Sequence, residues 1–320
     1  MTATLPDIGF QVWGQHTDWP SLAGVARRID ELGFSSLWSN DHFFPAAGAA
    51  AIGEDAPPGP FLEGWITLAG FAMVTSRVRL GVLVSGAGYR NVGLLVKQAT
   101  AVDHLSNGRV SLGLGAGWHP RDHAAFGFTL PPIGERLDRL EAQAAAARAL
   151  LDGETVTVDG PHVRLDRAVN LPPPVSVRMP LMIGGSGEKR TLRIVARHAD
   201  AWNGEGDAET WARRNRILDE HCATVGRDPA TIRRTAGLAP ASIRASRGEA
   251  ITALAERLAH NGLAPAEARE TAAGSPLVGT EADVAEALAA YRAAGAQEVL
   301  VDLPAPFDEA TLEALAGLRR

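Results

Sequence analysis

A polar tripeptide that could carry chemistry, Asn40-Asp41-His42, directly follows a segment predicted to be a strand, residues 34–39. Polar side chains at the carboxyl end of a strand are where α/β proteins place ligand-binding and catalytic groups. Histidine titrates near neutral pH, so His42 can give or take a proton. We therefore predict His42 as the catalytic residue, with packing beside Trp38 as the structural alternative. We expect Asp41 to hydrogen-bond within the same site.

A first glycine-rich segment lies at residues 113–117, where Gly113, Gly115 and Gly117 alternate with small or apolar residues at the end of another predicted strand. Glycine weakens a strand, so this alternation needs a reason. Close approach of a ligand to the backbone is one reason, and tight packing inside a barrel is the other. The third glycine of a G-x-G-x-x-G fingerprint is missing, which argues against a Rossmann dinucleotide site.

A second glycine-rich segment, Gly184-Gly185-Ser186-Gly187, lies between an apolar strand predicted at 180–183 and a helix predicted at 191–198. Free N–H groups and a hydroxyl at the start of a helix favour an anion, and Lys189 and Arg190 add positive charge. We predict that this loop binds a phosphate. The structural alternative is a plain loop with a basic first turn.

The elements that must position these residues repeat one unit, a strand followed by a helix. Residues 78–91 show it most clearly: the apolar run from Val78 to Val84 predicts a buried strand, and Ser85-Gly86-Ala87-Gly88 predicts a turn rather than more strand before a helix at 93–105. The other strands are predicted at 8–13, 34–39, 109–117, 180–183, 199–202, 232–238 and 298–303, and the other helices at 19–32, 63–76, 135–151, 191–198, 210–225, 249–259, 281–294 and 306–318.

Eight such units in 320 residues predict an α/β fold, a single (β/α)8 TIM barrel over residues 1–320. A β-hairpin is predicted at 155–165, and the Ala/Gly/Pro-rich segment 46–60 is expected to be a mobile loop that could act as a lid. The predicted insertions at the carboxyl-end mouth cover about 42–62, 118–132, 155–178 and 260–278.

Composition excludes several classes of function. A net charge of −6 argues against a nucleic-acid surface. The single cysteine, Cys222, excludes an intramolecular disulfide and a cysteine-built metal site, and no metal site is predicted. Residues 1–8 lack a signal-peptide core, and no apolar run is long enough to span a bilayer. We expect a cytoplasmic protein without membrane or nucleic-acid partners.

Several short motifs, in matching order over nearly the whole chain, resemble those of the bacterial-luciferase-like flavin and deazaflavin oxidoreductases. The similarity is greatest to the coenzyme-F420-dependent branch. The motifs are Glu31-Leu32-Gly33-Phe34 through Trp38 with Asp41-His42, Arg79-Leu80-Gly81 with Tyr89-Arg90-Asn91, Gly108-Arg109 through Trp118, Ile183 through Glu188 with Ala199-Asp200-Ala201-Trp202-Asn203, and Leu277-Val278-Gly279-Thr280.

The resemblance implies that coenzyme F420, or alternatively FMN, binds in the mouth of the barrel. It implies a bulge after the third strand, often with a non-prolyl cis peptide, that backs the tricyclic ring. The cofactor-binding residues it implies are Asp41, the bulge residues Leu83, Val84 and Ser85, the fourth-strand residues Gly115, Ala116, Gly117 and Trp118, and the phosphate loop Gly184, Gly185, Ser186 and Gly187.

Three functions remain open at this stage. The first is hydride transfer between reduced F420 and a small organic substrate, with His42 or water supplying the proton. The second is a two-component monooxygenase that uses reduced FMN and oxygen and takes its cofactor from a flavin or deazaflavin reductase. The third is a flavin-binding homologue without activity. A homodimer is expected from the family.

Two further expectations concern the pocket. A basic exit groove would favour F420, whose tail is acidic, and Arg90, Arg121, Arg178 and Lys189 are its candidate residues. The aromatic residues Trp13, Phe43, Phe44, Phe61 and Trp65 suggest an apolar pocket, although core packing explains several of them equally well.

Overall fold

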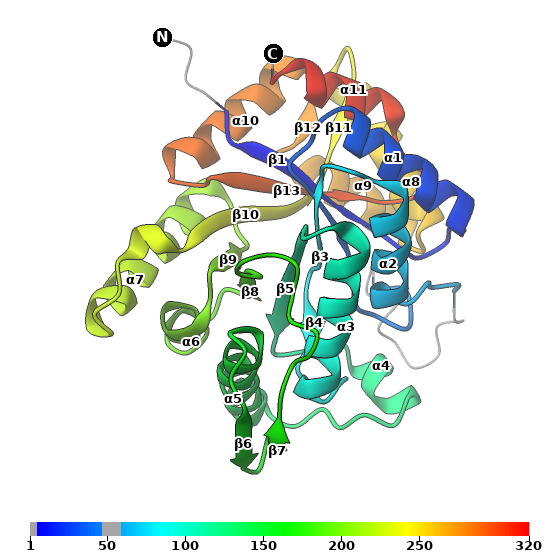
Figure 1. The fold of residues 1–320 in the computed structure, drawn as a ribbon. Coiled ribbons are helices and arrows are strands. Elements are labelled where there is room, and N and C mark those ends of the chain that lie inside the picture. The colour runs from blue at the N-terminus through cyan, green and yellow to red at the C-terminus, as the bar shows by residue number, and fades with distance from the viewer. Residues whose placement is uncertain (1–4, 47–58, 320) are drawn as a thin grey trace.

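The computed structural model describes residues 5–46 and 59–319. Eight parallel strands close into a barrel, because β1 pairs with both β2 and β13 while β3 pairs with β5, and this confirms the predicted TIM barrel (Figure 1). The strands of the barrel, in chain order, are β1 (Asp7–Val12), β2 (Ser36–Ser39), β3 (Arg79–Val82), β5 (Val110–Gly115), β8 (Leu181–Gly184), β9 (Ala201–Gly204), β10 (Arg233–Pro240) and β13 (Glu298–Leu303).

The predicted helices are confirmed, and they surround the barrel. Their ends follow local chemistry: the Asp18 side chain accepts the N–H of Ser21 at the start of the first helix, and Gly33 just after it has a positive φ. These helices are α1 (Trp19–Glu31), α2 (Gly64–Val74), α3 (Val92–Ser106), α5 (Ile133–Leu151), α6 (Thr191–His198), α7 (Ala208–Thr224), α8 (Arg247–His260), α10 (Glu281–Ala293) and α11 (Glu309–Gly317).

Some short elements were not predicted. The predicted turn at 85–88 is partly wrong, because Ser85 and Gly86 form β4 and pair with Leu114 and Gly115 of β5. The strand resumes there because the partner backbone of β5 continues beside it. The other additions are α4 (Pro120–Ala125), α9 (Pro265–Gly274), β11 (Ser242–Ile243) and β12 (Val278–Gly279).

The predicted hairpin is present as the antiparallel pair β6 (Val156–Asp159) and β7 (Arg164–Ala168). The chain that follows it runs along α3, where Lys97 Nζ donates to the carbonyl oxygen of Leu171 and His104 Nε2 lies 2.9 Å from that of Pro173. Of the loop predicted at 46–60, residues 47–58 lie outside the described residues, so the predicted lid does too.

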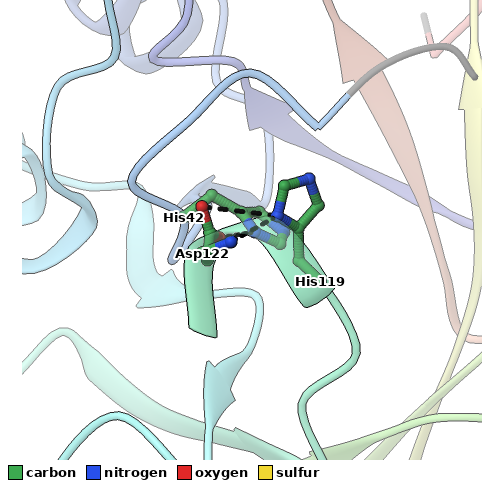
Figure 2. Close-up of side chains that lie close together, drawn as sticks. All are labelled: His42, His119 and Asp122. Atoms are coloured by element: carbon green, nitrogen blue, oxygen red, sulfur yellow. Dashed lines mark hydrogen bonds and ion pairs between the residues drawn. The ribbon is translucent and has the colours of Figure 1, made fainter. Parts of the chain in front are cut away.

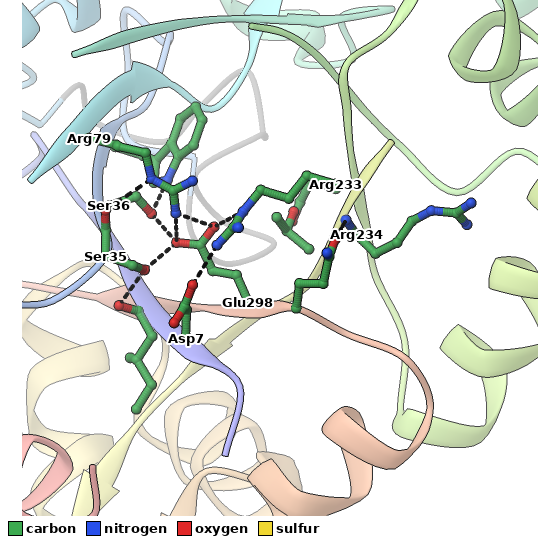
Figure 3. Close-up of polar contacts among 12 residues, drawn as sticks. Asp7, Ser35, Ser36, Arg79, Arg233, Arg234 and Glu298 are labelled. Atoms are coloured by element: carbon green, nitrogen blue, oxygen red, sulfur yellow. Dashed lines mark hydrogen bonds and ion pairs between the residues drawn. The ribbon is translucent and has the colours of Figure 1, made fainter. Parts of the chain in front are cut away.

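The amino ends of the strands are held together by one buried carboxylate, Glu298, at the start of β13 (Figure 3). It accepts hydrogen bonds from the hydroxyls of Ser35 and Ser36 and ion-pairs with Arg79 and Arg233, each at 3.3 Å. A buried carboxylate is tolerated when its oxygens are paired in this way. The cluster joins the starts of β2, β3, β10 and β13, which makes this end of the barrel structural.

At the carboxyl ends, β3 and β4 are separated by Leu83 and Val84, whose peptide bond is cis, as the resemblance implies. The Val84 side chain reaches across to β5 and β8. A Cβ atom added at Gly115 would lie 2.5 Å from Val84 Cγ2, and one added at Gly184 or Gly113 would lie 3.0 Å from Cγ1. Packing inside the barrel, the alternative to ligand approach, therefore explains Gly113 and Gly115.

This packing predicts how a substitution at Gly115 changes the stability of the protein. The Gly115→Ala substitution forces Val84 to move, and we expect it to destabilise the protein by about 1–3 kcal/mol. Most of that loss should be recovered in the double variant Gly115→Ala/Val84→Ala, measured by denaturant unfolding as a double-mutant cycle.

Gly24 on α1 provides the matched control, because an added Cβ there meets no atom within 4 Å. We expect Gly24→Ala to leave stability unchanged or to raise it by about 0.5–1 kcal/mol. If Gly115→Ala lowered stability equally in the wild-type and in the Val84→Ala backgrounds, the two positions would not share this space.

Candidate functional site

A cavity of about 530 Å³ opens at the carboxyl ends of the barrel strands. Ser85 is the one predicted site residue that does not line it; its hydroxyl is fully buried and accepts a hydrogen bond from Trp65 Nε1 at 2.9 Å. The structure brings the other predicted residues together in the cavity wall: Asp41, His42, Leu83, Val84, Gly115, Ala116, Gly117, Trp118, Gly184, Gly185, Ser186 and Gly187.

His42 is held by Asp122, a residue that the sequence did not single out. His42 Nδ1 lies 2.8 Å from Asp122 Oδ2 (Figure 2). The same oxygen accepts the hydroxyl of Tyr89 at 3.1 Å, and Oδ1 accepts the backbone N–H groups of Phe43 and Phe44. The Asp122 side chain is fully buried, so all of its partners come from the protein.

This environment sets the protonation of the pair. Burial alone would raise the pKa of the Asp122 carboxyl, but its contacts with His119 and His42 outweigh burial and hold that pKa well below its usual range. Burial and Asp122 together raise the pKa of Tyr89, so Tyr89 remains a donor. The ionised carboxylate holds the proton of His42 on Nδ1, which leaves Nε2 as the nitrogen available to the cavity.

His119 extends this cluster from the other side. Its Nδ1 accepts the backbone N–H of Asp122 at 3.2 Å and caps α4, while its Nε2 is buried without a partner in the described part of the chain. The atoms of His42, His119 and Asp122 that could ligate a metal ion lie within 4.8 Å of one another, a spacing that would suit a metal site. Because each Asp122 oxygen already accepts two protein donors, we interpret the cluster as a hydrogen-bond network.

Asp41 is engaged by a second buried ion pair. Arg90 Nη1 and Nη2 contact the two Asp41 oxygens at 2.6 and 3.0 Å, and Nη2 also contacts Glu63 at the start of α2. Burial opposes the charge on Arg90, but Asp41 and Glu63 outweigh it and raise the Arg90 pKa. Asp41 is therefore tied to the residues that precede α3 and α2 through Arg90 and Glu63, which fixes the loop after β2.

The loop at 184–187 presents unpaired donors to the cavity. The N–H groups of Ser186 and Gly187 donate no hydrogen bond within the described part of the chain. A Cβ added at Gly187 would lie 2.7 Å from the hydroxyl oxygen of Thr191, the first residue of α6. Gly187 thus leaves the start of this helix open, which is the arrangement that binds phosphates elsewhere.

The cavity contains a carboxyl group that sequence reasoning missed, Asp302 near the end of β13. It is only 8% exposed, and its Oδ1 has no hydrogen-bond partner in the described residues. Beside it on β1, Gln11 donates through Nε2 to the carbonyl oxygen of Leu83 at 2.6 Å. The only signal available in the sequence was a polar residue inside the apolar run 299–303.

The structure separates the candidate residues for a basic groove and for an aromatic lining. Of the arginines, Arg90 is paired with Asp41, and Arg178 is paired with Asp200 at the amino-terminal side of β9. Of the predicted aromatic lining, Trp13 faces the cavity, while Trp65 is buried in the core and Phe43 stacks on Phe128. Arg121 lies over the ring of Phe44, and Phe61 lies beside the His42 ring.

The chain folds as a TIM barrel with its cavity at the carboxyl ends of the strands, where the glycine loop 184–187 opens a helix. The family model described as luciferase-like monooxygenase matches residues 7–298, and the chain belongs to this family. Its members are F420- or FMN-dependent oxidoreductases.

Individual proteins of known sequence or structure are similar to this chain. An uncharacterized protein of Mycobacterium tuberculosis is 31% identical over 189 residues, which cover 56% of this chain and 66% of that protein's length. The fold is similar to an F420-dependent secondary alcohol dehydrogenase in complex with an F420-acetone adduct (TM-score 0.83, 17% identity, 99% and 100% of the two chains). It is also similar to a riboflavin lyase with modified FMN (TM-score 0.77, 15% identity, 99% and 90%).

None of the helices within residues 5–46 and 59–319 combines the length and the hydropathy that a membrane crossing requires.

The Asp122 network predicts the state of His42. In the wild-type protein we expect the neutral His42 ring to carry its proton on Nδ1, as read from ¹⁵N chemical shifts. Asp122→Asn places an amide among buried donors, so it should remove this tautomer preference and destabilise the protein by about 3 kcal/mol.

Asp166→Asn on the exposed hairpin is the control and should change stability by less than about 0.5 kcal/mol. A wild-type His42 with its proton on Nε2 would contradict the proposed hydrogen-bond direction.

Proposed function

We propose that this protein transfers a hydride between coenzyme F420 and a small organic substrate. The observation that carries the proposal is the His42–Asp122 pair at the wall of the cavity, with His42 Nε2 left available. Reduction of a carbonyl or an activated double bond needs a proton as well as a hydride, and an imidazole held by a carboxylate can supply it. The likeness of the whole fold to an F420-dependent secondary alcohol dehydrogenase supports this choice of cofactor.

The residues present suit a tricyclic cofactor with a phosphate. Leu83 and Val84 form an apolar floor, and the backbone from Gly115 to Gly117 forms a wall with little side-chain bulk. The unpaired N–H groups of Ser186 and Gly187, with the start of α6, would hold the phosphate. The exposed Trp118 stands at the edge of the same wall.

When bound, F420 supplies or accepts the hydride. The side chains of the protein give or take the proton that accompanies the hydride. In the reducing direction, protonated His42 releases a proton from Nε2 to the substrate, and the neutral ring that remains keeps its Nδ1 proton on Asp122. In the oxidising direction, neutral His42 takes a proton at Nε2, and the adjacent Asp122 carboxylate stabilises the resulting imidazolium. Either direction uses the same fixed ring.

The first test is titration of the purified apoprotein with F420 and, separately, with FMN, followed by fluorescence. We expect F420 to bind tightly and FMN weakly. Gly187→Ala should weaken F420 binding about tenfold, because its Cβ crowds Thr191 at the phosphate loop. Gly24→Ala, remote from the cavity, is the matched control and should bind like the wild type.

The opposite preference would replace hydride transfer by FMN-dependent oxygenation, with a flavin reductase as partner. Binding of neither cofactor would overturn the proposed function and the phosphate assignment together.

We also propose a homodimer formed through α2 and the neighbouring α3. The sequence of α2 contains no charged residue, and two of its outward side chains, Ile66 and Met73, are 73% and 67% exposed. Leu94 of the neighbouring α3 is also exposed, and α2 and α3 are in contact. The uncharged face of α2 offers an apolar patch, and a twofold axis would cover it with an identical patch.

Met73→Glu should convert this dimer to a monomer, because it buries two charges at the symmetric interface. Sedimentation velocity at several concentrations measures the change. Val177→Glu, at a fully exposed valine away from α2, should leave the dimer intact. A wild-type protein that sediments as a monomer would refute the interface.

A further inference from the structure

We propose that Asp302 donates a hydrogen bond to an uncharged oxygen of the substrate and thereby restricts the enzyme to ketones, enones, aldehydes and alcohols that carry no negative charge. This inference rests on the proposed function and identifies the substrate class of the same cavity. Asp302 is then the residue that holds the substrate oxygen, while His42 handles the proton.

The position of Asp302 supports this role. On β13 it lies level with Gln11 of β1 on one side and Pro240 of β10 on the other, at the carboxyl ends of all three strands. Its side chain lines the cavity, and its Oδ1 is buried without a partner in the described part of the chain. A buried polar atom with no partner costs free energy, which a ligand group at hydrogen-bond distance would recover.

Comparison with Glu298 on the same strand makes this clear. Four residues earlier, the Glu298 carboxylate is surrounded by serine hydroxyls and two arginines. In the described part of the chain no lysine or arginine pairs with the Asp302 carboxyl. A buried carboxyl without a counter-ion keeps its proton, and a protonated carboxyl is a hydrogen-bond donor.

The charges around Asp302 agree with this protonation. The pKa of Asp302 is raised to about 7: burial is the largest cause, a hydrogen bond from Trp13 opposes it, and the nearby Glu205 adds to it. The other ionisable groups of the cavity are engaged elsewhere: Asp41 with Arg90, and His42 and Tyr89 with Asp122. Below neutral pH, Asp302 is therefore mainly a neutral donor.

The fixed charges of the cavity wall also disfavour an anion beside Asp302. Among the described residues that line it there is no lysine or arginine, whereas Glu205 and Asp302 both face it. A carboxylate or phosphate ester bound near Asp302 would meet two acidic groups and no counter-ion. An uncharged carbonyl or hydroxyl oxygen accepts the Asp302 hydrogen bond without that cost.

The first test needs neither cofactor nor substrate. ¹³C-NMR of protein labelled at the aspartate carboxyls, with Asp302→Asn to assign the signal, follows the ionisation of Asp302. We expect a midpoint near pH 7, shifted downward by Glu205→Gln. A midpoint near the ordinary aspartate value of about 4 would overturn the proposal.

Stability should follow the same ionisation. The unfolded chain loses the Asp302 proton near pH 4, and the folded protein keeps it to about pH 7. This group therefore favours folding least above pH 7, and its contribution to stability falls as the pH rises between these two values. Asp302→Asn should remove that fall. The melting temperature of the variant minus that of the wild type should therefore increase as the pH rises from 4 to 7.

The second test uses two probes of equal chain length, 2-pentanone and pentanoate, with binding followed by saturation-transfer NMR on the protein, including its cofactor where one is found. At pH 6 we expect 2-pentanone to bind and pentanoate not to bind. Binding of 2-pentanone should weaken at least tenfold at pH 8.5 in the wild type, but not in Asp302→Asn, whose amide still donates. Asp302→Leu should lose binding at both pH values.

These outcomes separate the two proposals. If a cofactor binds but Asp302→Leu holds 2-pentanone as tightly as the wild type does, the substrate anchor fails and the proposed function stands. If neither cofactor binds, the proposed function fails, and the pH dependence of 2-pentanone binding in the wild type and in Asp302→Asn still decides the role of Asp302. Equal binding of pentanoate and 2-pentanone at pH 6 would also overturn the anchor.

Discussion

The carboxyl end of this barrel depends on the space occupied by one side chain, Val84. Its methyl groups fill positions where a Cβ of Gly113, Gly115 or Gly184 would stand, so the strands β5 and β8 can approach only because those residues lack side chains. Gln11 holds the preceding carbonyl from β1. Four strands are thereby joined around the interruption after β3, and the result is the floor of the cavity.

The two ends of β13 show how one strand serves two purposes. At its amino end Glu298 is surrounded by donors and cations that tie neighbouring strands together. Near its carboxyl end Asp302 is also buried, but its Oδ1 has no hydrogen-bond partner and no cation pairs with it in the described part of the chain. The cost of an incompletely paired carboxyl is acceptable at a ligand site, where a substrate completes the pairing, and in a TIM barrel that site lies at the carboxyl end. The difference in surroundings, rather than in residue type, separates the structural acid from the functional one.

Much of this arrangement was predictable, for identifiable reasons. Alternating strand and helix patterns indicated the barrel, and a polar residue at the end of a strand identified His42. The bulge at Leu83-Val84 and the assignment of Gly184–Gly187 to a cofactor phosphate came from family resemblance. Asp122 escaped prediction because it lies 80 residues from its partner His42. Asp302 was hidden within an apolar strand. The pairing of Arg90 with Asp41 could not be foreseen, because charge in a sequence does not reveal its partners.

The phosphate loop has a consequence for how such an enzyme would work with its cofactor. Arg190, the cation nearest in sequence to the start of α6, is paired with Asp138 and with the carbonyl oxygen of Gly134. An anion bound at this loop would meet neutral amide and hydroxyl donors, which hold it less strongly than an arginine clamp does. A cofactor held in this way would be able to leave after each turnover. The protein would then use its cofactor as a diffusible electron carrier, reduced or oxidised again by another enzyme, rather than as a permanently bound prosthetic group.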